Sequence, residues 1–332
     1  MRAPGIIAVA ILLAGTLGAA EPATHPNPAW EIYARPHQLI DVGGRRLNLY
    51  CLGHGSPTVI LDGGLGDDVT EWRDVQDPIA RQTRVCAYDR AGYGFSDPGP
   101  TPRTAAALDA DLEALLHAAD LRPPYVLVGA SLAGLHVRLF ADRHRSEVAG
   151  MVLVDPSFEH QVARYEAATP AYVPAAERQL ATFKRCIEAL RAGVPARDSQ
   201  TYKDCIGDPD PDLPNDVVAA LAARVRPDTY VMILSELEEF SGASSEEVDA
   251  SRRSYGDMPL IVLTAGLAPN ADPDTVTRTK IWTAMHDRMA QLSSRGVNRI
   301  IPGATHHIQQ SRPQAVIAAV NEVVTAAREG GR

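Results

Sequence analysis

The chain has 332 residues, of which 45% are hydrophobic, and it carries a formal net charge of −9. This length is ample for a buried core in one or two domains, and the net negative charge argues against binding to the phosphate backbone of nucleic acids. No period of roughly 20–50 residues repeats along the chain, so the sequence gives no sign of a repeat architecture.

The first 20 residues have the pattern of a secretory signal peptide. Arg2 is followed by an apolar run over 6–17 and by small residues at 18–20, which is the order of features in exported proteins. We therefore expect residues 1–20 to be cleaved, residues 21–36 to form a linker, and the protein to be secreted or periplasmic. An uncleaved anchor is the alternative, but the apolar run is shorter than a bilayer span. No later segment is long and apolar enough to cross a membrane.

Seven short apolar segments beyond the linker have the pattern of strands. Several of them are continuous runs of Val, Ile and Leu, as expected for strands that are buried on both faces. The expected strands cover residues 46–51, 58–61, 84–88, 125–128, 150–154, 260–264 and 298–301.

Helical patterns lie between these strands. Apolar residues recur at helical spacing over 108–116 and again over 316–323, where Pro313 stands in the first turn. Strands that alternate with helices predict a mostly parallel central sheet flanked by helices. The sequence therefore predicts an α/β fold.

One long segment interrupts this alternation. Residues 156–257 lie between two expected strands but contain helical patterns, such as those over 175–192 and 216–224, and loops rich in Pro and Asp. We expect residues 37–155 and 258–332 to form the core and the inserted segment to form a helical cap over an active site. A second independent domain is the alternative interpretation.

A serine stands in the sharpest turn signal of the sequence. The expected strand ends in Gly129-Ala130-Ser131-Leu132-Ala133, and a helical pattern follows. Small neighbours allow the tight strand-to-helix bend that exposes a nucleophilic serine, and the N–H of Leu132 then points to the position of an oxyanion. The usual pattern is G-x-S-x-G, whereas this chain has Ala133 at the last position and Gly134 after it. The turn predicts Ser131 as a nucleophile.

Four motifs, in this order, resemble those of the α/β-hydrolase superfamily. Residues 60–66 resemble its HGGPG-type loop, with Asp62 in place of the usual His, and residues 89–97 resemble its D-x-x-G-x-G-x-S-D turn. The serine turn comes next, and residues 303–313 resemble the loop that carries the catalytic His before the last helix. The resemblance covers residues 45–328 and implies the α/β-hydrolase fold, with the helical cap inserted after the sixth strand.

A base for the serine is expected near the C-terminus. A serine hydroxyl is a poor nucleophile at neutral pH and needs a base within hydrogen-bond reach, for which histidine is suited. His306 and His307 are adjacent candidates, and the register of the resemblance implies His306 as the catalytic residue. We expect His307 to support the site or to face the cap.

The acid that orients this histidine has two candidates. Asp155 follows the strand beside that of the nucleophile, where side chains point into the crevice of an open α/β sheet, and some esterases and lipases that the chain resembles take their acid from this position. Asp272 follows the strand after the insertion, as in many other relatives, but it comes late in a Pro-rich loop. We favour Asp155 and keep Asp272 as the alternative. A further alternative is that Asp155 only caps the start of the insertion.

The resemblance also implies a second oxyanion donor. In register with the HGGPG motif, the N–H of Gly64 joins that of Leu132, and the absence of a Cβ allows a close approach of substrate. The alternative is that Gly63 and Gly64 form only a turn. We interpret Asp89 and Arg90, in the neighbouring motif, as turn and ion-pair residues that hold the loop near the site.

The four cysteines are an even number in a chain that we expect to be exported, so we expect disulfides. The sequence alone permits three pairings, and the spacing fits no zinc site. The implied fold places the second and fourth strands side by side, which pairs Cys51 with Cys86 and leaves Cys186 with Cys205 in the cap.

These residues predict a serine hydrolase that cleaves a carboxylic ester of a small or medium substrate through an acyl-enzyme intermediate. We expect no metal, no organic cofactor and no nucleic-acid partner, and we expect the substrate to be a small-molecule ester or amide. A serine nucleophile argues against the haloalkane dehalogenases and epoxide hydrolases of the superfamily, which use Asp.

Other functions compete with this one. The DGGLG loop resembles that of proline iminopeptidases, which hold the substrate's amino group with cap carboxylates, and Glu236, Glu238 and Glu239 are candidates for that role. The same charge run is also typical of a solvated helix face. A lactonase is a further alternative, as is a binding or signalling protein that keeps the fold without the chemistry.

Overall fold

A computed structural model describes residues 27–169, 171–208, 210–268 and 271–330. The signal-peptide prediction for residues 1–20 and the first part of the expected linker lie outside the described residues. The rest of the expected linker begins with the 3₁₀ helix η1 (Pro28–Ala34).

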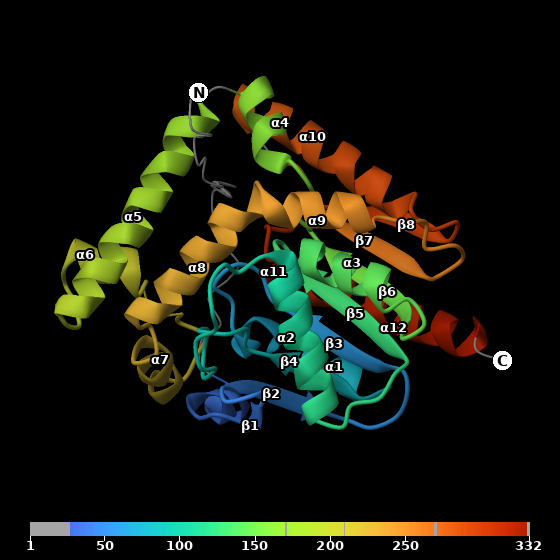
Figure 1. Ribbon diagram of the computed structural model, residues 1–332, viewed down its shortest axis with the longest axis horizontal. Helices are drawn as coiled ribbons and strands as arrows, with labels where there is room; N and C mark the ends of the chain where they lie inside the picture. The colour runs from blue at the N-terminus through green and yellow to red at the C-terminus, as the bar shows by residue number, and fades with distance from the viewer. Residues whose placement is uncertain (1–26, 170, 209, 269–270, 331–332) are drawn as a thin grey trace.

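An eight-stranded sheet forms the centre of the protein (Figure 1). Its strands are β1 (Gln38–Asp41), β2 (Arg46–Leu52), β3 (Thr58–Asp62), β4 (Val85–Tyr88), β5 (Tyr125–Ala130), β6 (Val148–Val154), β7 (Leu260–Ala265) and β8 (Gly296–Ile301). Their order across the sheet is β1-β2-β4-β3-β5-β6-β7-β8. β2 pairs antiparallel with β1 and with β4, and the other pairings are parallel. The prediction of a mostly parallel sheet is confirmed.

The sequence analysis missed one strand, β1. Three of its four residues are exposed, because β1 lies at the edge of the sheet and pairs only with β2. An exposed edge strand lacks the continuous apolar run that marks a strand buried on both faces. The other seven strands match the expected segments to within a few residues.

Helices cover both faces of the sheet (Figure 1). They are α1 (Gln76–Ala80), α2 (Ala105–Ala118), α3 (Ala133–Arg143), α10 (Pro273–Ala290), the short α11 (Ile308–Ser311) and α12 (Pro313–Gly330). Side chains of α2, α3 and α10 bury one face, and those of α1 and α12 bury the other. The strands alternate between the two layers: in β5, Leu127 joins the first layer, while Val126 and Val128 join the second.

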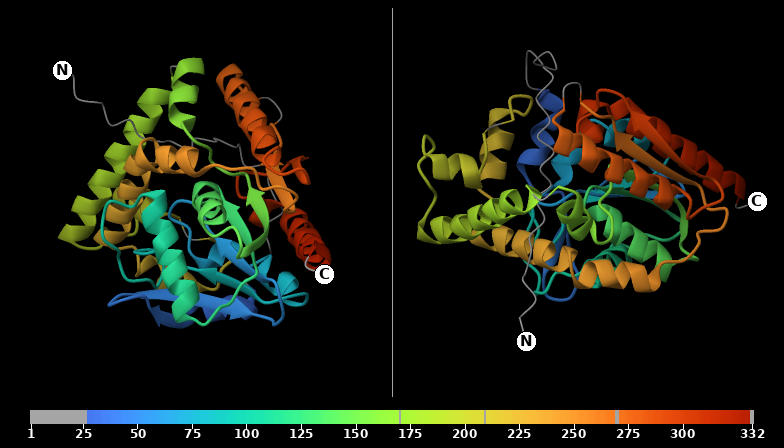
Figure 2. Two further views of the ribbon diagram at one scale, coloured as in Figure 1. Left: turned by 45° about the vertical axis from the view of Figure 1, so that its right-hand side comes forward. Right: turned by 90° about the horizontal axis from the view of Figure 1, so that it is seen from above.

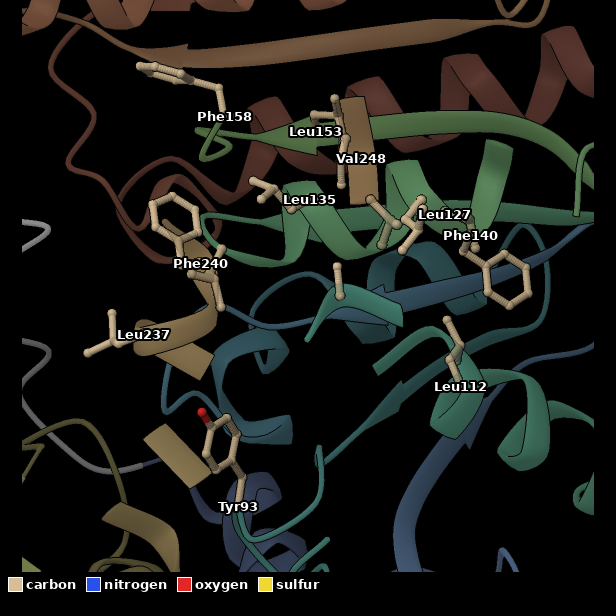
Figure 3. Packing of buried hydrophobic residues seen from close by; sticks show 14 of the residues in the cluster. Tyr93, Leu112, Leu127, Leu135, Phe140, Leu153, Phe158, Leu237, Phe240 and Val248 are labelled. Carbon is tan, nitrogen blue, oxygen red and sulfur yellow. The ribbon is translucent and has the colours of Figure 1, made fainter. Parts of the chain in front are cut away.

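The described residues of the segment between β6 and β7 form helices joined by loops and contain no strand. Its helices are α4 (Gln161–Ala168), α5 (Tyr172–Ala192), α6 (Gln200–Cys205), α7 (Asn215–Ala222), α8 (Pro227–Phe240) and α9 (Ala243–Ser251). α5 packs on α8, and α4 lies against α10 (Figure 2). α9 packs on α2 and α3. Figure 3 shows Phe240 and Val248 of this segment beside Leu135 of α3. This packing places the inserted segment next to the core.

The four cysteines lie in two pairs at disulfide distance. Cys51 and Cys86 are opposite each other on β2 and β4, with sulfur atoms 2.05 Å apart. Cys186 on α5 and Cys205 on α6 have sulfur atoms 1.99 Å apart. Within the described ranges, no helix combines the length and the apolar character that a membrane span needs.

Candidate active site

Ser131 stands on a tight bend between β5 and α3. Its φ of 51° lies in the left-handed region, which residues with a Cβ seldom adopt. Backbone strain of this kind persists where the surrounding structure holds it, and such places are often functional. The side chain is largely buried but lines a cavity. The sequence therefore holds a hydroxyl at the carboxyl end of a buried strand.

Two glycines make room for this bend. A Cβ on Gly129 would lie 2.7 Å from Val137 Cγ2 and 2.9 Å from the carbonyl oxygen of Ala133. A Cβ on Gly134 would lie 2.4 Å from the Cβ of Pro156. The departure from G-x-S-x-G therefore has a structural reason: Ala133 fits at the usual glycine position, and the close approach falls one residue later.

Replacing Gly134 by alanine should lower the free energy of unfolding by about 1–3 kcal/mol, because the added methyl group overlaps Pro156 and the backbone must shift. Urea unfolding measures this change. Gly330→Ala is the matched control, because no atom lies within 4 Å of the position of its Cβ. Equal stability of Gly134→Ala and the unmodified protein would contradict the close contact.

Three predicted residues lie in one hydrogen-bonded chain. His306 Nε2 is 2.9 Å from Ser131 Oγ, and His306 Nδ1 is 2.6 Å from Asp155 Oδ2. Asp155 is fully buried directly after β6. Its other oxygen accepts the indole N–H of Trp282 at 2.7 Å and the N–H of Ala265 at 2.9 Å. Serine, imidazole and carboxylate thus stand in the order that nucleophilic catalysis requires.

The carboxyl of Asp155 is held in its ionised form. Burial alone would raise its pKa, but the hydrogen bond and charge of His306, with the Trp282 N–H, outweigh it and bring the pKa below its usual value. An ionised carboxylate can keep a proton on His306 Nδ1, which leaves Nε2 free to accept the proton of Ser131. Trp282 was not singled out from the sequence, where nothing links it to Asp155.

Asp272 lies elsewhere. It caps the start of α10, where its carboxylate accepts the N–H groups of Asp274 and Thr275. It is exposed and has no hydrogen bond to His306 in the described structure. The structure therefore brings Asp155, and not the alternative Asp272, beside the imidazole.

The two expected oxyanion donors differ in their hydrogen bonding. The N–H of Leu132 has no acceptor among the described residues. Gly64 lies close to the serine, since a Cβ there would be 3.1 Å from Ser131 Cβ, but its N–H donates to Asp67 Oδ2 at 2.7 Å. The sequence analysis did not identify Asp67. The only signal was an acidic residue three positions after Gly64 in a loop expected to lie at the site.

Arg90 contacts the glycine loop, which comprises residues 62–66. Its guanidinium donates to the carbonyl oxygens of Gly63 at 2.5 Å and Gly64 at 2.6 Å. In a trans peptide the N–H points away from the C=O, so these bonds turn the N–H groups of Gly64 and Leu65 away from Arg90. The guanidinium also pairs with Asp62 at 2.7 Å. Arg90 is thus an ion-pair residue, as expected, and it orients the loop.

Glu236 is the second carboxylate paired with Arg90, at 3.0 Å, and it is fully buried. It does not line the cavity of the site, and Glu238 and Glu239 do not line it either. The carboxylates considered as anchors for a substrate amino group are therefore not placed for that role.

His307 supports the histidine loop. Its Nδ1 lies 2.7 Å from Glu71 Oε1, and Gln310 donates to the other oxygen of Glu71 at 2.6 Å. Gln309 also donates to Glu71. The hydrogen bond to Glu71 raises the pKa of His307 to about 9, so His307 is cationic at neutral pH. These contacts connect the loop of His306 to the 3₁₀ helix η2 (Val69–Trp72), which follows the glycine loop.

A cavity of about 450 Å³ opens over Ser131 and His306. Its lining combines the glycine loop with apolar side chains of the inserted segment. Those side chains are Phe183, Ile206, Val225, Tyr230 and Ile233. The volume suits a small or medium ligand.

Comparison with known proteins gives the same architecture. A family model described as the alpha/beta hydrolase fold matches residues 57–229. The uncharacterized protein YqjL of Bacillus subtilis (strain 168) is 24% identical over 275 residues, which cover 83% of this chain and 86% of YqjL. Several other curated relatives are matched over less than half of their own length.

Solved structures also resemble the chain, at identities that show the fold alone. A thermophilic esterase from Thermogutta terrifontis has a TM-score of 0.56 and 19% identity, over 85% of this chain and 94% of the esterase. The enol-lactonase from Burkholderia xenovorans LB400 has a TM-score of 0.54 and 19% identity, over 87% of this chain and 100% of the lactonase.

Proposed function

The chain belongs to the alpha/beta hydrolase fold family, and from that premise we propose that it is a serine hydrolase that cleaves a carboxylic ester of a small or medium substrate. The observation that carries the proposal is the hydrogen-bonded chain from Ser131 Oγ through His306 to Asp155, with distances of 2.9 Å and 2.6 Å. The cavity over Ser131 supplies the space for the substrate.

The proposed reaction has two halves. Ser131 Oγ attacks the carbonyl carbon while His306 Nε2 takes its proton, and Asp155 stabilises the resulting imidazolium. The N–H of Leu132 and that of Gly64 hold the negative oxygen of the tetrahedral intermediate. His306 then protonates the leaving alcohol, and an acyl group remains on Ser131.

The second half releases the acyl group. His306 takes a proton from a water molecule, and the resulting hydroxide attacks the acyl carbon. Collapse of this intermediate returns the proton to Ser131 and frees the carboxylic acid. No metal or organic cofactor takes part in the proposed reaction.

We also propose that the protein is exported and that residues 156–257 act as a cap. The two cysteine pairs support export, because disulfides persist in oxidising compartments. The apolar side chains that this segment contributes to the cavity support the role of a cap.

A panel of substrates tests the proposed activity. We expect hydrolysis of nitrophenyl acyl esters, much slower hydrolysis of a proline anilide, and labelling of Ser131 by a fluorophosphonate probe, located by mass spectrometry. We expect esters to be preferred because Glu236, the buried one of the three candidate carboxylates for a substrate amine, is already paired with Arg90. Faster turnover of the anilide or of a lactone would identify a different substrate class, and absence of labelling at Ser131 would contradict the serine mechanism.

A further inference from the structure

The carboxylate of Asp67 accepts the N–H of Gly64, which the proposed reaction needs as a donor to the oxyanion. Asp67 Oδ2 lies 2.7 Å from the N of Gly64, and an oxyanion held by the same N–H would lie at about 2.7–3.1 Å from that atom. Asp67 and Ser131 line the same cavity. An ionised carboxylate at this place therefore competes with the oxyanion for its donor and repels its charge.

The surrounding backbone holds the carboxylate in this place. The N–H of Asp67 donates to the carbonyl oxygen of Gly64 at 3.3 Å, which closes a turn over 64–67. A Cβ on Gly63 would lie 2.8 Å from the Cβ of Asp67, so the side chain folds back closely over the glycine loop. Arg90 fixes the same loop through two carbonyl oxygens. These contacts keep the side chain of Asp67 beside the Gly64 N–H.

We propose that Asp67 is a further catalytic residue of the oxyanion site, which acts in its neutral form by donating its carboxyl O–H to the oxyanion. When it is ionised, the carboxylate instead occupies the Gly64 N–H and blocks the site. The acid donates a hydrogen bond and keeps its proton, so no atom is transferred in this step. A neutral carboxylic acid serves as an oxyanion donor in ketosteroid isomerase. This inference rests on the proposed function.

The charges around Asp67 agree with a neutral form near pH 7. Burial is the largest influence and Glu71 of η2 the next, and both raise the pKa of Asp67; His307 and Arg90 lower it, as does the Gly64 N–H, and the result is about 7. Asp68 is the adjacent acidic residue, and its own pKa is raised by burial.

The walls that α5 and α8 contribute to the cavity add no charge near neutral pH. From α5 and α8 the cavity receives Gln179, Phe183 and Ile233, which do not titrate. Tyr230 of α8 lies on the same wall, and its hydroxyl donates to the carbonyl oxygen of Cys205. Burial raises the pKa of Tyr230 to about 12, so it stays neutral.

The direction of the pH dependence follows from the raised pKa. Below about pH 7 Asp67 is neutral and donates, and as pH rises through 7 it ionises and blocks the donor. We therefore expect kcat/KM to fall above pH 7, and the fall should be absent in Asp67→Asn, because an amide stays neutral. If only the neutral acid is productive, the rate of the unmodified protein divided by that of Asp67→Asn should drop about tenfold between pH 6 and pH 8.

Dividing the two rates cancels the effects of ionisable groups that both proteins share. His306 is present in both proteins, as is Asp89, whose pKa is also raised to about 7, mainly by its burial. Glu238→Gln is the matched control, because it replaces a carboxyl group by an amide at an exposed position outside the cavity. Its pH profile should follow that of the unmodified protein. Asp67→Ala removes the donor altogether and should be slower than the unmodified protein at pH 6.

Infrared difference spectra test the titration without relying on activity. Between pH 6 and pH 8 the unmodified protein should lose more of the carbonyl band of protonated carboxylic acids than Asp67→Asn, in which Asp89 still titrates. A constant rate ratio from pH 6 to pH 8 would overturn the proposal, as would an equal loss of the band in the two proteins. A faster reaction of the unmodified protein than of Asp67→Asn at pH 8, confined to an ester with an ammonium group, would also overturn it, because Asp67 would then be a substrate-binding carboxylate. If nitrophenyl esters are not hydrolysed but the band titrates as expected, the result contradicts the proposed function and not the titration of Asp67.

Discussion

Replacing Ser131 by alanine should lower kcat for ester hydrolysis by a factor on the order of 10⁵–10⁶, as for the loss of the nucleophile in a serine protease. The hydroxyl 2.9 Å from His306 Nε2 is the group proposed to form the acyl-enzyme. Without it, the oxyanion donors and the cavity remain, but no covalent intermediate can form. The measurement is the rate of nitrophenyl ester hydrolysis, with loss of fluorophosphonate labelling as a second readout.

The matched control is Ser157→Ala. Ser157 is a buried serine close to the bend, since its N–H donates to the carbonyl oxygen of Ser131 at 2.8 Å. Its hydroxyl has no hydrogen-bond partner in the part of the chain that the structure describes, so we expect Ser157→Ala to keep the rate within about threefold. If Ser131→Ala kept more than about one hundredth of the activity, a different nucleophile would have to be sought.

Asp155→Asn should lower kcat by about 10⁴-fold, the size of the loss when the triad acid becomes an amide in a serine protease. Asp155 Oδ2 lies 2.6 Å from His306 Nδ1, and a neutral amide neither balances the imidazolium nor selects the tautomer that leaves Nε2 free. Trp282 and Ala265 bind the other oxygen, which an amide retains. The fold should therefore survive, and circular dichroism checks that it does.

Asp272→Asn is the comparison variant. Asp272 caps α10 through the N–H groups of Asp274 and Thr275, and asparagine caps a helix about as well as aspartate. Both stability and activity should therefore stay close to those of the unmodified protein. A large loss in Asp272→Asn together with a small loss in Asp155→Asn would reverse the assignment of the acid.

The inserted segment shows where reasoning from the sequence alone fails. The acidic run at 236–239 offered carboxylates for a substrate amine, and its alternative interpretation was a solvated helix face. Glu236 is instead buried against Arg90, which lies 146 positions earlier in the chain. A buried ion pair between distant residues leaves no local pattern in the sequence. Asp67 was overlooked for a related reason: its contact with Gly64 is local, but its place in the same cavity as Ser131 arises only from the packing of distant segments.

Local sequence patterns by themselves determined the architecture. Runs of Val, Ile and Leu mark strands that are buried on both faces, and small residues around Ser131 mark a bend that only small neighbours permit. These features depend on residues close together in the chain, so they can be predicted without the fold. The predicted α/β fold is confirmed, and so is the α/β-hydrolase fold that the resemblance of four motifs implied.

Only the tertiary structure decided which aspartate meets His306, which carboxylate holds Gly64, and which glutamate is already paired. Asp155 and His306 are 151 positions apart, and their hydrogen bond exists because the parallel strands β6 and β8, which precede them, end at the same edge of the sheet. Composition and spacing identify residues that can do chemistry. Distance, burial and neighbouring charge select among them, and these quantities arise only when remote segments are packed together.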